Sequence, residues 1–435
     1  MDVKIKKTDH GLLGKLSFPG DKSLSHRAII FGSLAEGESH FTNVLAGEDC
    51  VCTRKAFEKL GVEIRASSPT ELYIKGKGLH ALQAPREDID LGNSGTSIRL
   101  LMGILAGNPF EATLTGDLSL CSRPMRRVTD YLKQMGATLE GRDDANFAPI
   151  RMKGGKLRGI EAELPISSAQ VKSAILLAGL YAEGQTSVTE PVRSRDHTER
   201  FLKYFGGSIE ENGLTVSIKG GQKLKAKSFE IAGDISSAAF FMAMAALVKG
   251  SAISFKEVLW NPTRLGIVEV MKRMGAHFDE LKLSDTKGPE VISDFSIQPR
   301  PLNAFEIKRE ELPSLIDEVP ILTVLATQAK GKSIIYEADE LRVKETDRIH
   351  SMVSQLSKMG ARIEAKGNTI VVEGPTALHG AKVDSLKDHR TAMSLIVAGM
   401  MADGETMVRD LECINTSFPN FFELLKKVKV GYELC

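Results

Sequence analysis

The chain has 435 residues, more than one hydrophobic core usually organises, so two or three domains are expected. Its 57 Lys and Arg residues nearly cancel its 56 Asp and Glu residues, which argues against a nucleic-acid binder held by bulk positive charge. The longest apolar run, residues 238–248, is well short of the roughly 18 residues that a membrane span needs. The first residues lack the apolar stretch of a signal peptide, so we expect a cytoplasmic protein.

Five cysteines in a chain of this length are a sparse and odd-numbered set, which favours a reducing compartment. They are Cys50, Cys52, Cys121, Cys413 and Cys435. Cys50 and Cys52 form a CxC pair, but no second pair or histidine cluster completes a tetrahedral metal site. We therefore interpret these two as buried thiols, and we expect neither a metal nor a cofactor.

One sequence pattern recurs six times: an apolar run typical of a helix, then a glycine, then a stretch rich in β-forming residues. The copies lie at residues 25–41, 96–114, 169–188, 236–255, 317–336 and 389–408. Their glycines are Gly37, Gly107, Gly184, Gly250, Gly331 and Gly404. Because the runs are apolar on nearly every face, we expect six buried helices, each followed by a strand.

A second marker follows five of these copies and is typical of an amphipathic helix that ends before an alternating strand. Its glycines are Gly61, Gly136, Gly206, Gly275 and Gly360. We expect glycine there because it accepts the left-handed conformation that caps a helix. The sixth copy, near Val428, lacks the glycine.

The repeats are about seventy residues long, which is too large for a solenoid unit and suits an α/β subdomain with two helices and several strands. Six such repeats, three in each half, would divide the chain near residue 234. The sequence therefore predicts an α/β fold built from two similar halves.

Polar residues precede every predicted buried helix. They are Asp21-Lys22-Ser23, Asn93-Ser94-Gly95-Thr96, Ser167-Ser168-Ala169-Gln170, Asp234 with Ser236-Ser237, Asp317-Glu318 and Asp388-His389-Arg390. The simplest interpretation makes the Ser, Thr, Asn and Asp residues N-caps. The macrodipole, however, disfavours a cation at a helix N-terminus by about 0.3–1 kcal/mol. The cations at these positions are Lys22, Arg27, Arg99 and Arg390. A bound phosphate or carboxylate would compensate, so we predict anion binding at these helix ends.

Three further clusters carry similar chemistry. They are Arg123 with Arg126 and Arg127, then Arg193 with Arg195 and His197, and finally Lys344 with Glu345, Asp347 and Arg348. A charge run such as the last is more often a solvated loop. Together the clusters predict a site between the two halves for at least two acidic groups. Neither a GxGxxG after a strand nor a complete phosphate loop of the NTPase kind occurs in the sequence.

Nine motifs resemble those of one enzyme family. In chain order they are DKSLSHRAI, LGNSGTSIRLL, GDLSLCSRPM, SSAQVKSAILLAGL, RDHTE, LIDEVPIL, ELRVKETDR, KDHR and TSFPNFF. They span essentially the whole chain and resemble the 5-enolpyruvylshikimate-3-phosphate synthases, the 3-phosphoshikimate 1-carboxyvinyltransferases of aromatic biosynthesis. The resemblance implies a two-domain inverse α/β barrel of six βαβαββ-like units, three per domain. It places domain A at 1–19 plus 235–435, domain B at 20–234, and the active site in the cleft between them.

The resemblance also implies site residues. It places phosphoenolpyruvate near Lys22, Gly95, Arg123, Gln170, Arg348 and Arg390. It places shikimate 3-phosphate near Lys22, Ser23, Arg27, Ser168, Ala169, Gln170, Asp317 and Lys344. Ala169, Arg195 and Thr416 depart from one branch of the family and follow another, in which the arginine replaces a tyrosine as a substrate contact. We therefore add Arg195 to the shikimate 3-phosphate site and leave Thr416 out.

The implied reaction transfers the enolpyruvyl group of phosphoenolpyruvate to the 5-hydroxyl of shikimate 3-phosphate by addition and elimination, and releases phosphate. It needs a carboxylate to take the hydroxyl proton, an acid that reaches C3, and cations for two phosphates and a carboxylate. We assign Asp317 and Glu345 as the paired carboxylates and Lys22 as their cationic partner, with Glu345 favoured for C3. We expect a monomer that binds these small molecules without nucleic acid or membrane.

Two alternatives stay open. A UDP-N-acetylglucosamine enolpyruvyl transferase would share the fold, but that family carries a reactive cysteine five residues before the arginine matching Arg123, where this chain has Leu118. A non-catalytic binder of phosphorylated metabolites would keep the arginines and replace Asp317, Glu345 or Lys22, all of which are present. A turnover assay with each acceptor separates these hypotheses.

Overall fold

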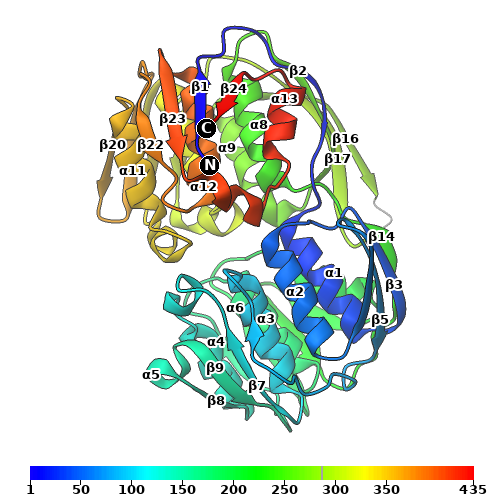
Figure 1. Cartoon of the computed structure of the whole chain (residues 1–435). Helices are drawn as coiled ribbons and strands as arrows, with labels where there is room; N and C mark the ends of the chain where they lie inside the picture. The colour runs from blue at the N-terminus through cyan, green and yellow to red at the C-terminus, as the bar shows by residue number, and fades with distance from the viewer. Residues whose placement is uncertain (286–287) are drawn as a thin grey trace. The chain divides into compact units, whose positions relative to one another are not determined.

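The computed structural model describes residues 1–285 and 288–435 (Figure 1). Within these ranges the chain forms two compact units. Unit 1 consists of Met1–Pro19, Ala232–Asp285 and Glu290–Cys435, and unit 2 consists of Gly20–Ile231 and a short segment that ends at Pro289. The chain therefore leaves unit 1 after Pro19 and returns to it at Ala232.

Three four-stranded sheets occur in each unit among the described residues, and all six have one plan. An edge strand pairs in parallel with its neighbour, and the next two strands are antiparallel. In unit 2 the orders are β14 (Ser228–Glu230), β3 (Glu36–Thr42), β5 (Glu71–Lys77), β4 (Glu63–Ser68); β6 (Ile89–Asp90), β7 (Glu111–Thr115), β9 (Phe147–Lys153), β8 (Thr138–Gly141); and β10 (Glu161–Glu163), β11 (Gln185–Thr189), β13 (Thr215–Lys219), β12 (Ile209–Asn212). In unit 1 they are β2 (Leu13–Ser17), β15 (Ala252–Leu259), β17 (Val291–Gln298), β16 (His277–Asp285); β18 (Glu306–Ile307), β19 (Gly331–Ile335), β21 (Thr369–Gly374), β20 (Arg362–Lys366); and β22 (Lys382–Asp384), β23 (Glu405–Arg409), β1 (Val3–Lys6), β24 (Tyr432–Leu434).

Each repeat also contributes one buried helix and one amphipathic helix. The buried helices are α1 (Lys22–Leu34), α3 (Gly95–Ala106), α6 (Ala169–Gly179), α8 (Ile235–Leu247), α10 (Val319–Gln328) and α12 (His389–Met401). The amphipathic helices are α2 (Glu48–Lys59), α4 (Arg126–Met135), α7 (His197–Tyr204), α9 (Gly266–Arg273), α11 (Arg348–Lys358) and α13 (Phe421–Lys427). Short turns complete the chain: α5 (Arg142–Ala145), η1 (Leu120–Ser122), η2 (Pro262–Arg264), η3 (Arg309–Ser314), η4 (Asp339–Val343) and η5 (Leu411–Thr416). The predicted α/β fold of six βαβαββ-like repeats is confirmed.

Three strands pair outside the repeat in which they are synthesised. Strand β2 precedes α1 in the chain, yet it pairs with β15 of unit 1. Strand β14 precedes α8, yet it pairs with β3 of unit 2. Strand β1 lies between β23 and β24, where Val3 is in register with both Val408 and Leu434. The last sheet therefore contains the first strand of the chain.

The buried helices fill the cores of the two units, as predicted. Every residue of α8 from Ile235 to Ala246 is buried. In unit 2, α3 and α6 lie side by side (Figure 1), and a Cβ atom on Gly103 would lie 2.2 Å from the carbonyl oxygen of Ala174. Glycine at this position therefore lets the two backbones touch, because interiors pack too densely to leave room for a methyl group. In the described part of the chain, no helix combines the length and apolar character of a membrane span.

The second marker ends the amphipathic helices as predicted. All five glycines have positive φ, from +84° at Gly360 to +111° at Gly136. In the sixth repeat the equivalent residue after the C-cap Val428 is Lys429, which adopts φ +67°. The backbone geometry of the repeat is therefore kept even where the side chain disfavours it.

Candidate functional site

Polar residues before five of the six buried helices act as N-caps, whereas α10, which follows Glu318, has no side-chain cap among the described residues. In unit 2 the side chains of Asp21, Ser94 and Ser168 accept hydrogen bonds from backbone N–H groups of the first turn at 2.9, 3.2 and 3.4 Å. In unit 1 Asp234 and Asp388 do the same at 2.8 Å. The simplest interpretation is therefore correct for these five residues but wrong for the entry to α10, and any ligand role of the five must come in addition to capping.

Lys22 and Arg27 lie on the first turns of α1. The Lys22 ammonium forms an ion pair with Asp49 of α2, and both side chains are largely buried. The Arg27 guanidinium donates to the Ser23 carbonyl oxygen at 3.0 Å, to Ser173 Oγ at 2.9 Å and to Thr198 Oγ1 at 2.8 Å. Helices α1, α6 and α7 thus hold Arg27 from three sides, and Ser23 lies beside it.

Gly95, Arg123 and Gln170 come together in unit 2 around the side chain of Arg99. Arg99 Nη1 donates to the Gly95 carbonyl oxygen at 3.1 Å and to Gln170 Oε1 at 3.0 Å. Gln170 Nε2 donates in turn to Thr96 Oγ1 at 2.9 Å. A Cβ atom on Gly95 would lie 2.7 Å from Arg99 Nη1 and 3.3 Å from Arg123 Nη1. Arg99 therefore joins the start of α3 to the start of α6.

Arg123 follows the turn η1 and is 8% exposed. It donates to the Asn93 carbonyl oxygen at 3.2 Å and to Ser119 Oγ at 3.1 Å, and it also contacts Asn93 Oδ1. Its Nε is buried and has no hydrogen-bond partner among the described residues. The neighbouring Arg126 instead pairs with Asp143 at the surface, 3.1 Å apart. The predicted arginine cluster therefore contains one buried member, Arg123, whose Nε–H is available to a ligand, and two exposed members, Arg126 and Arg127.

Ser168 and Arg195 lie on two segments that one carboxylate connects. Glu190 Oε1 accepts a hydrogen bond from the Ser168 backbone N–H, and Glu190 Oε2 accepts one from the Ser194 backbone N–H, both at 3.2 Å. Ala169 begins α6 directly after the Ser168 cap. Arg195, next to Ser194, is half-buried.

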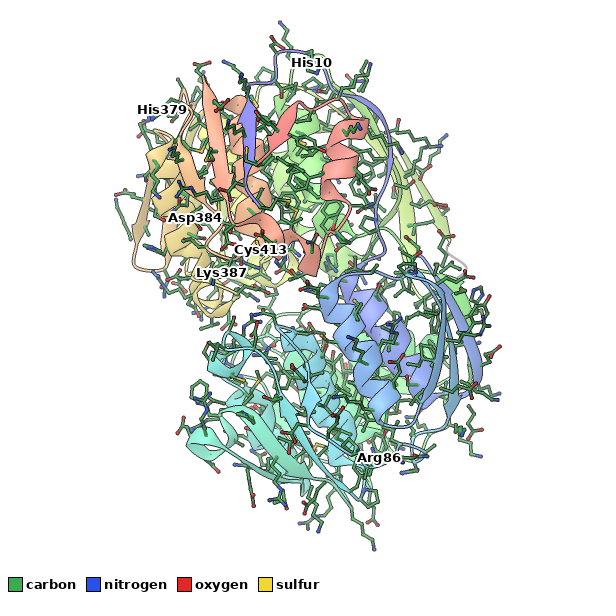
Figure 2. The ribbon with its side chains drawn as sticks, in the orientation of Figure 1. His10, Arg86, His379, Asp384, Lys387 and Cys413 are labelled. Atoms are coloured by element: carbon green, nitrogen blue, oxygen red, sulfur yellow. The ribbon has the colours of Figure 1, made fainter. Side chains whose placement is uncertain are left out.

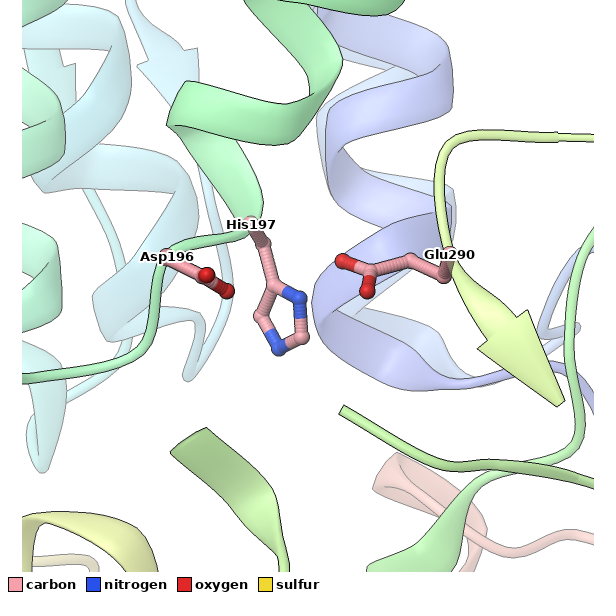
Figure 3. Close-up of side chains that lie close together, drawn as sticks. All are labelled: Asp196, His197 and Glu290. Carbon is pink, nitrogen blue, oxygen red and sulfur yellow. The ribbon is translucent and has the colours of Figure 1, made fainter. Parts of the chain in front are cut away.

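The segment that contains Arg195 leads into α7. Figure 3 shows Asp196 on the loop and His197 as the first residue of the helix, and both are buried. Glu290, drawn in the same close-up, belongs to unit 1, where it accepts a hydrogen bond from Asn261 at 2.9 Å. Arg193 donates to the Gly213 carbonyl oxygen at 2.9 Å and is largely exposed.

In unit 1, three carboxylates surround the Arg348 guanidinium, whose side chain is 1% exposed. Nε donates to Asp388 at 2.9 Å, Nη2 to Glu345 at 2.6 Å and Nη1 to Asp317 at 3.3 Å. Burial alone would lower the pKa of Arg348, but these carboxylates hold it above its ordinary value. The structure therefore brings together three predicted residues, namely Asp317, Glu345 and Arg348.

Lys344 and Asp347 flank that cluster and behave differently. Burial lowers the pKa of Lys344, and Arg348 adds to this effect while Asp317 and Glu345 oppose it. Asp347 caps α11 by accepting from the His350 N–H at 3.0 Å. In this charge run, Glu345 and Arg348 thus belong to a buried ion cluster, whereas Asp347 is an ordinary helix cap.

Arg390 lies on the first turn of α12 and is 7% exposed. Its Nη1 is 3.8 Å from Glu318 Oε1, and its buried Nε has no hydrogen-bond partner within the described ranges. Glu318 also accepts a hydrogen bond from Ser236, which in turn accepts one from Arg264 at 2.7 Å. This chain links the N-terminal ends of α8, α10 and α12.

The loop before α12 has an unusual backbone. Leu386 and Lys387 have φ angles of +51° and +61°, and the Leu386 N–H donates to Asp384 Oδ1 at 2.7 Å. Figure 2 labels Asp384, the last residue of β22, and the exposed Lys387 on the loop that follows it. The side-chain hydrogen bond fixes the approach to Asp388, which both caps α12 and holds Arg348.

Sequence reasoning missed three side chains that hold the predicted ones in place: Asp49, Glu190 and Glu318. In the sequence Glu318 stands only at a helix entry, and Asp49 and Glu190 belong to none of the motifs. Their partners are distant in sequence, so no local motif identified them. Among the described residues none of the five cysteines forms a disulfide. Cys50 is buried beside Lys22, with Sγ 3.9 Å from the Lys22 carbonyl oxygen.

Comparisons with known proteins give one consistent result. A family model described as EPSP synthase (3-phosphoshikimate 1-carboxyvinyltransferase) matches residues 6–425. The chain is 47% identical over 424 residues to a 3-phosphoshikimate 1-carboxyvinyltransferase of Bacillus cereus (strain B4264), covering 98% of each protein. It is 48% identical over 415 residues to the protein of that name from Brevibacillus brevis, covering 95% of this chain and 97% of the relative. A solved structure of EPSP synthase from Acinetobacter baumannii is similar with a TM-score of 0.89 and 41% identity, covering 99% of both chains.

Proposed function

This chain belongs to the EPSP synthase (3-phosphoshikimate 1-carboxyvinyltransferase) family, and from that premise we propose how its residues carry out the reaction. The reaction transfers the enolpyruvyl group of phosphoenolpyruvate to the 5-hydroxyl of shikimate 3-phosphate and releases inorganic phosphate. One observation supports the assignment of roles most directly. Asp317 and Glu345, the two carboxylates that the chemistry requires, lie on the same buried guanidinium, that of Arg348.

Phosphoenolpyruvate is proposed to bind near Lys22, Gly95, Arg123, Gln170, Arg348 and Arg390. Two of these arginines, Arg123 and Arg390, each keep a buried Nε–H without a hydrogen-bond partner among the described residues. A buried donor of this kind is costly unless a ligand oxygen satisfies it. A phosphate or carboxylate supplies such an oxygen, and guanidinium groups suit both.

Shikimate 3-phosphate is proposed to bind near Lys22, Ser23, Arg27, Ser168, Ala169, Gln170, Arg195, Asp317 and Lys344. In unit 2, the N-terminal ends of α1 and α6 supply backbone N–H groups beside Ser23 and Ser168. Arg27 brings positive charge to the same pair of helices, because it donates to Ser173 of α6. This arrangement favours a phosphate group there.

The proposed chemistry has two steps. In the addition, Asp317 takes the proton of the 5-hydroxyl, the hydroxyl oxygen bonds to C2 of phosphoenolpyruvate, and Glu345 in its acid form protonates C3. In the elimination, C3 returns its proton to Glu345, the bond between C2 and the phosphate oxygen breaks, and phosphate leaves with the proton held by Asp317. Lys22 and the arginines stabilise the negative charge of the phosphate throughout.

Asp317→Ala tests the assignment of the base. We expect turnover to fall by at least about a hundredfold, since general-base catalysis contributes roughly 10²–10⁴. Shikimate 3-phosphate should still bind in calorimetry. Phosphate release is measured with both substrates, with each alone, and with UDP-N-acetylglucosamine as the acceptor. A near-normal rate in D317A would remove Asp317 from this role. If phosphate were released from phosphoenolpyruvate with UDP-N-acetylglucosamine as the acceptor but not with shikimate 3-phosphate, the proposed acceptor would be rejected.

The domain organisation is proposed to follow from this chemistry. Domains at 1–19 plus 235–435 and at 20–234 would each supply part of the site in a cleft, and would close when both phosphates neutralise the facing cations. The residues assigned above fall in both units, which supports a shared site. Small-angle scattering should therefore show compaction when shikimate 3-phosphate is added, and an unchanged radius of gyration would contradict closure.

The remaining proposals concern surroundings rather than chemistry. We propose a cytoplasmic monomer that needs no metal or cofactor and binds neither nucleic acid nor membrane. Five cysteines that form no disulfide in the described part of the chain suit a reducing compartment. Full activity after dialysis against a chelator, and sedimentation at the mass of one chain, are the expected results.

A further inference from the structure

Unit 2 contains a buried ion cluster that the proposed chemistry does not use. Lys172 of α6 lies with its Nζ 2.8 Å from Glu190 Oε2 and 2.8 Å from Glu199 Oε1, and each of the three side chains is 2% exposed. Burying such charges is expensive, and replacing them with apolar residues is often neutral or stabilising. The cluster therefore calls for an explanation other than stability.

The two glutamates differ in what else they hold. Glu190 also accepts the backbone N–H groups of Ser168 and Ser194, one on each carboxylate oxygen, at 3.2 Å. Glu199 Oε2, by contrast, is buried without a hydrogen-bond partner in the described part of the chain. Burial raises the pKa of Glu199 despite the attraction of Lys172. Glu190 is thus the carboxylate whose oxygens are fully engaged.

The two segments that Glu190 joins have a common feature. Ser168 caps α6 and directly precedes Ala169 and Gln170, while Ser194 directly precedes Arg195. All of these except Ser194 were assigned above to shikimate 3-phosphate. The backbone N–H groups of Ser168 and Ser194 donate to the two oxygens of one planar carboxylate. A shift of one segment relative to the other would therefore lengthen at least one of these hydrogen bonds.

We propose that Glu190, held by Lys172, is a positioning residue for shikimate 3-phosphate: it fixes the spacing between the α6 N-terminus and Arg195. This inference rests on the proposed function. Glu190 itself touches no substrate in this scheme, and it acts by keeping two phosphate-binding segments in the conformation that they need. Binding of phosphoenolpyruvate should depend on Glu190 far less. Of the residues proposed for that substrate only Gln170 lies beside Ser168, and its side chain is also held by Arg99 and Thr96. Arg123 and Gly95 are held by Asn93 and Arg99.

Glu190→Gln tests the proposal, with Glu199→Gln as the matched control. Both variants neutralise one of two equally buried carboxylates on the same lysine, but only E190Q weakens the contacts to Ser168 and Ser194. Charge-assisted hydrogen bonds are about twice as strong as neutral ones. We expect the KM for shikimate 3-phosphate to rise about tenfold in E190Q, with the KM for phosphoenolpyruvate changing less than about twofold. In E199Q neither KM should change by more than about twofold.

Hydrogen exchange provides a readout that does not depend on activity. The amides of residues 168 and 194 should exchange about tenfold faster in E190Q than in wild type, and at the wild-type rate in E199Q. If E190Q fails to fold, Glu190→Asp keeps the charge, withdraws the carboxylate by one methylene, and carries the same two expectations.

Equal effects of E190Q and E199Q, or equal increases in both KM values in E190Q, would overturn the inference. So would unchanged exchange at residues 168 and 194. A different result would contradict the proposed function itself: wild-type protein would release no phosphate when both substrates are present. If the wild-type protein is active and E190Q and E199Q give the same KM values and exchange rates, only the proposed role of Glu190 is rejected.

Discussion

Asp388 performs two tasks at once, and its replacement should reveal both. Its Oδ1 caps α12 by accepting from the N–H groups of Arg390 and Thr391 at 2.8 and 3.0 Å, and its Oδ2 accepts from Arg348 Nε at 2.9 Å. The residue is fully buried. Asp388→Ala therefore removes a cap and one partner of a buried cation in a single change.

The expected cost follows from these two contacts. Loss of an N-cap costs about 1 kcal/mol. Breaking a buried ion pair costs about 3–5 kcal/mol, and because Arg348 keeps Asp317 and Glu345, we take roughly 3 kcal/mol. D388A should therefore lower the free energy of unfolding by about 4 kcal/mol. Asp388→Ser keeps a capping oxygen and should lose roughly 3 kcal/mol.

Urea unfolding followed by circular dichroism measures these differences, with the slope compared between variants so that a changed unfolded state is recognised. Asp347→Ala is the matched control. Asp347 caps α11 at 3.0 Å and pairs with Arg342 at 2.6 Å, but this pair lies at the surface. D347A should lose only about 1 kcal/mol. If D388A cost no more than D347A, the cluster around Arg348 would not stabilise unit 1 as argued.

Three further predictions concern other parts of the molecule. Burial, with the nearby charges of Lys22 and Arg27, lowers the pKa of His26 well below its ordinary value of 6.5. The unfolded chain therefore binds a proton there before the folded protein does, and the free energy of unfolding should fall as pH drops below about 6.5, by up to about 1.4 kcal/mol per pH unit from this group. Urea titrations at several pH values should show that component in wild type and lose it in His26→Asn. Gly95→Ala should raise the KM for phosphoenolpyruvate, since the new Cβ would lie 2.7 Å from Arg99 Nη1; an unchanged KM in steady-state kinetics would show that Arg99 yields freely. Gly136→Ala, at φ +111°, should cost about 1–2 kcal/mol in thermal or urea unfolding, while Lys429→Gly, at φ +67°, should gain up to about 1 kcal/mol; the reverse order of the two effects would contradict the capping argument.

Local patterns were enough to predict the repeat and its helix ends. Runs of apolar residues identified six buried helices because such a pattern depends only on neighbouring residues. The glycines of the second marker identified the left-handed caps for the same reason. Lys429 was not identified, because a lysine gives no local sign that its backbone must adopt positive φ.

Pairings between distant segments were beyond the reach of the sequence pattern. Nothing in residues 3–6 indicates that this strand lies between β23 and β24, and nothing in β2 or β14 indicates that each pairs outside its own repeat. In the candidate site, too, local patterns indicate some residues, and others become apparent only from partners that are distant in the sequence. Lys22 and Arg390 are predictable because cations at helix starts conflict with the macrodipole, whereas Asp49 and Glu190 resemble ordinary acidic residues until their partners are known.

The position of β1 in the last sheet determines when unit 1 can be completed during synthesis. Val3 leaves the ribosome among the first residues, but its partners Val408 and Leu434 are among the last, about 20–80 s later at ordinary translation speeds. Unit 2 does not face this delay, because its last strand, β14, is finished at Glu230. Unit 2 should therefore fold first on the nascent chain, while the opening strand stays unpaired and available to chaperones until translation is almost over.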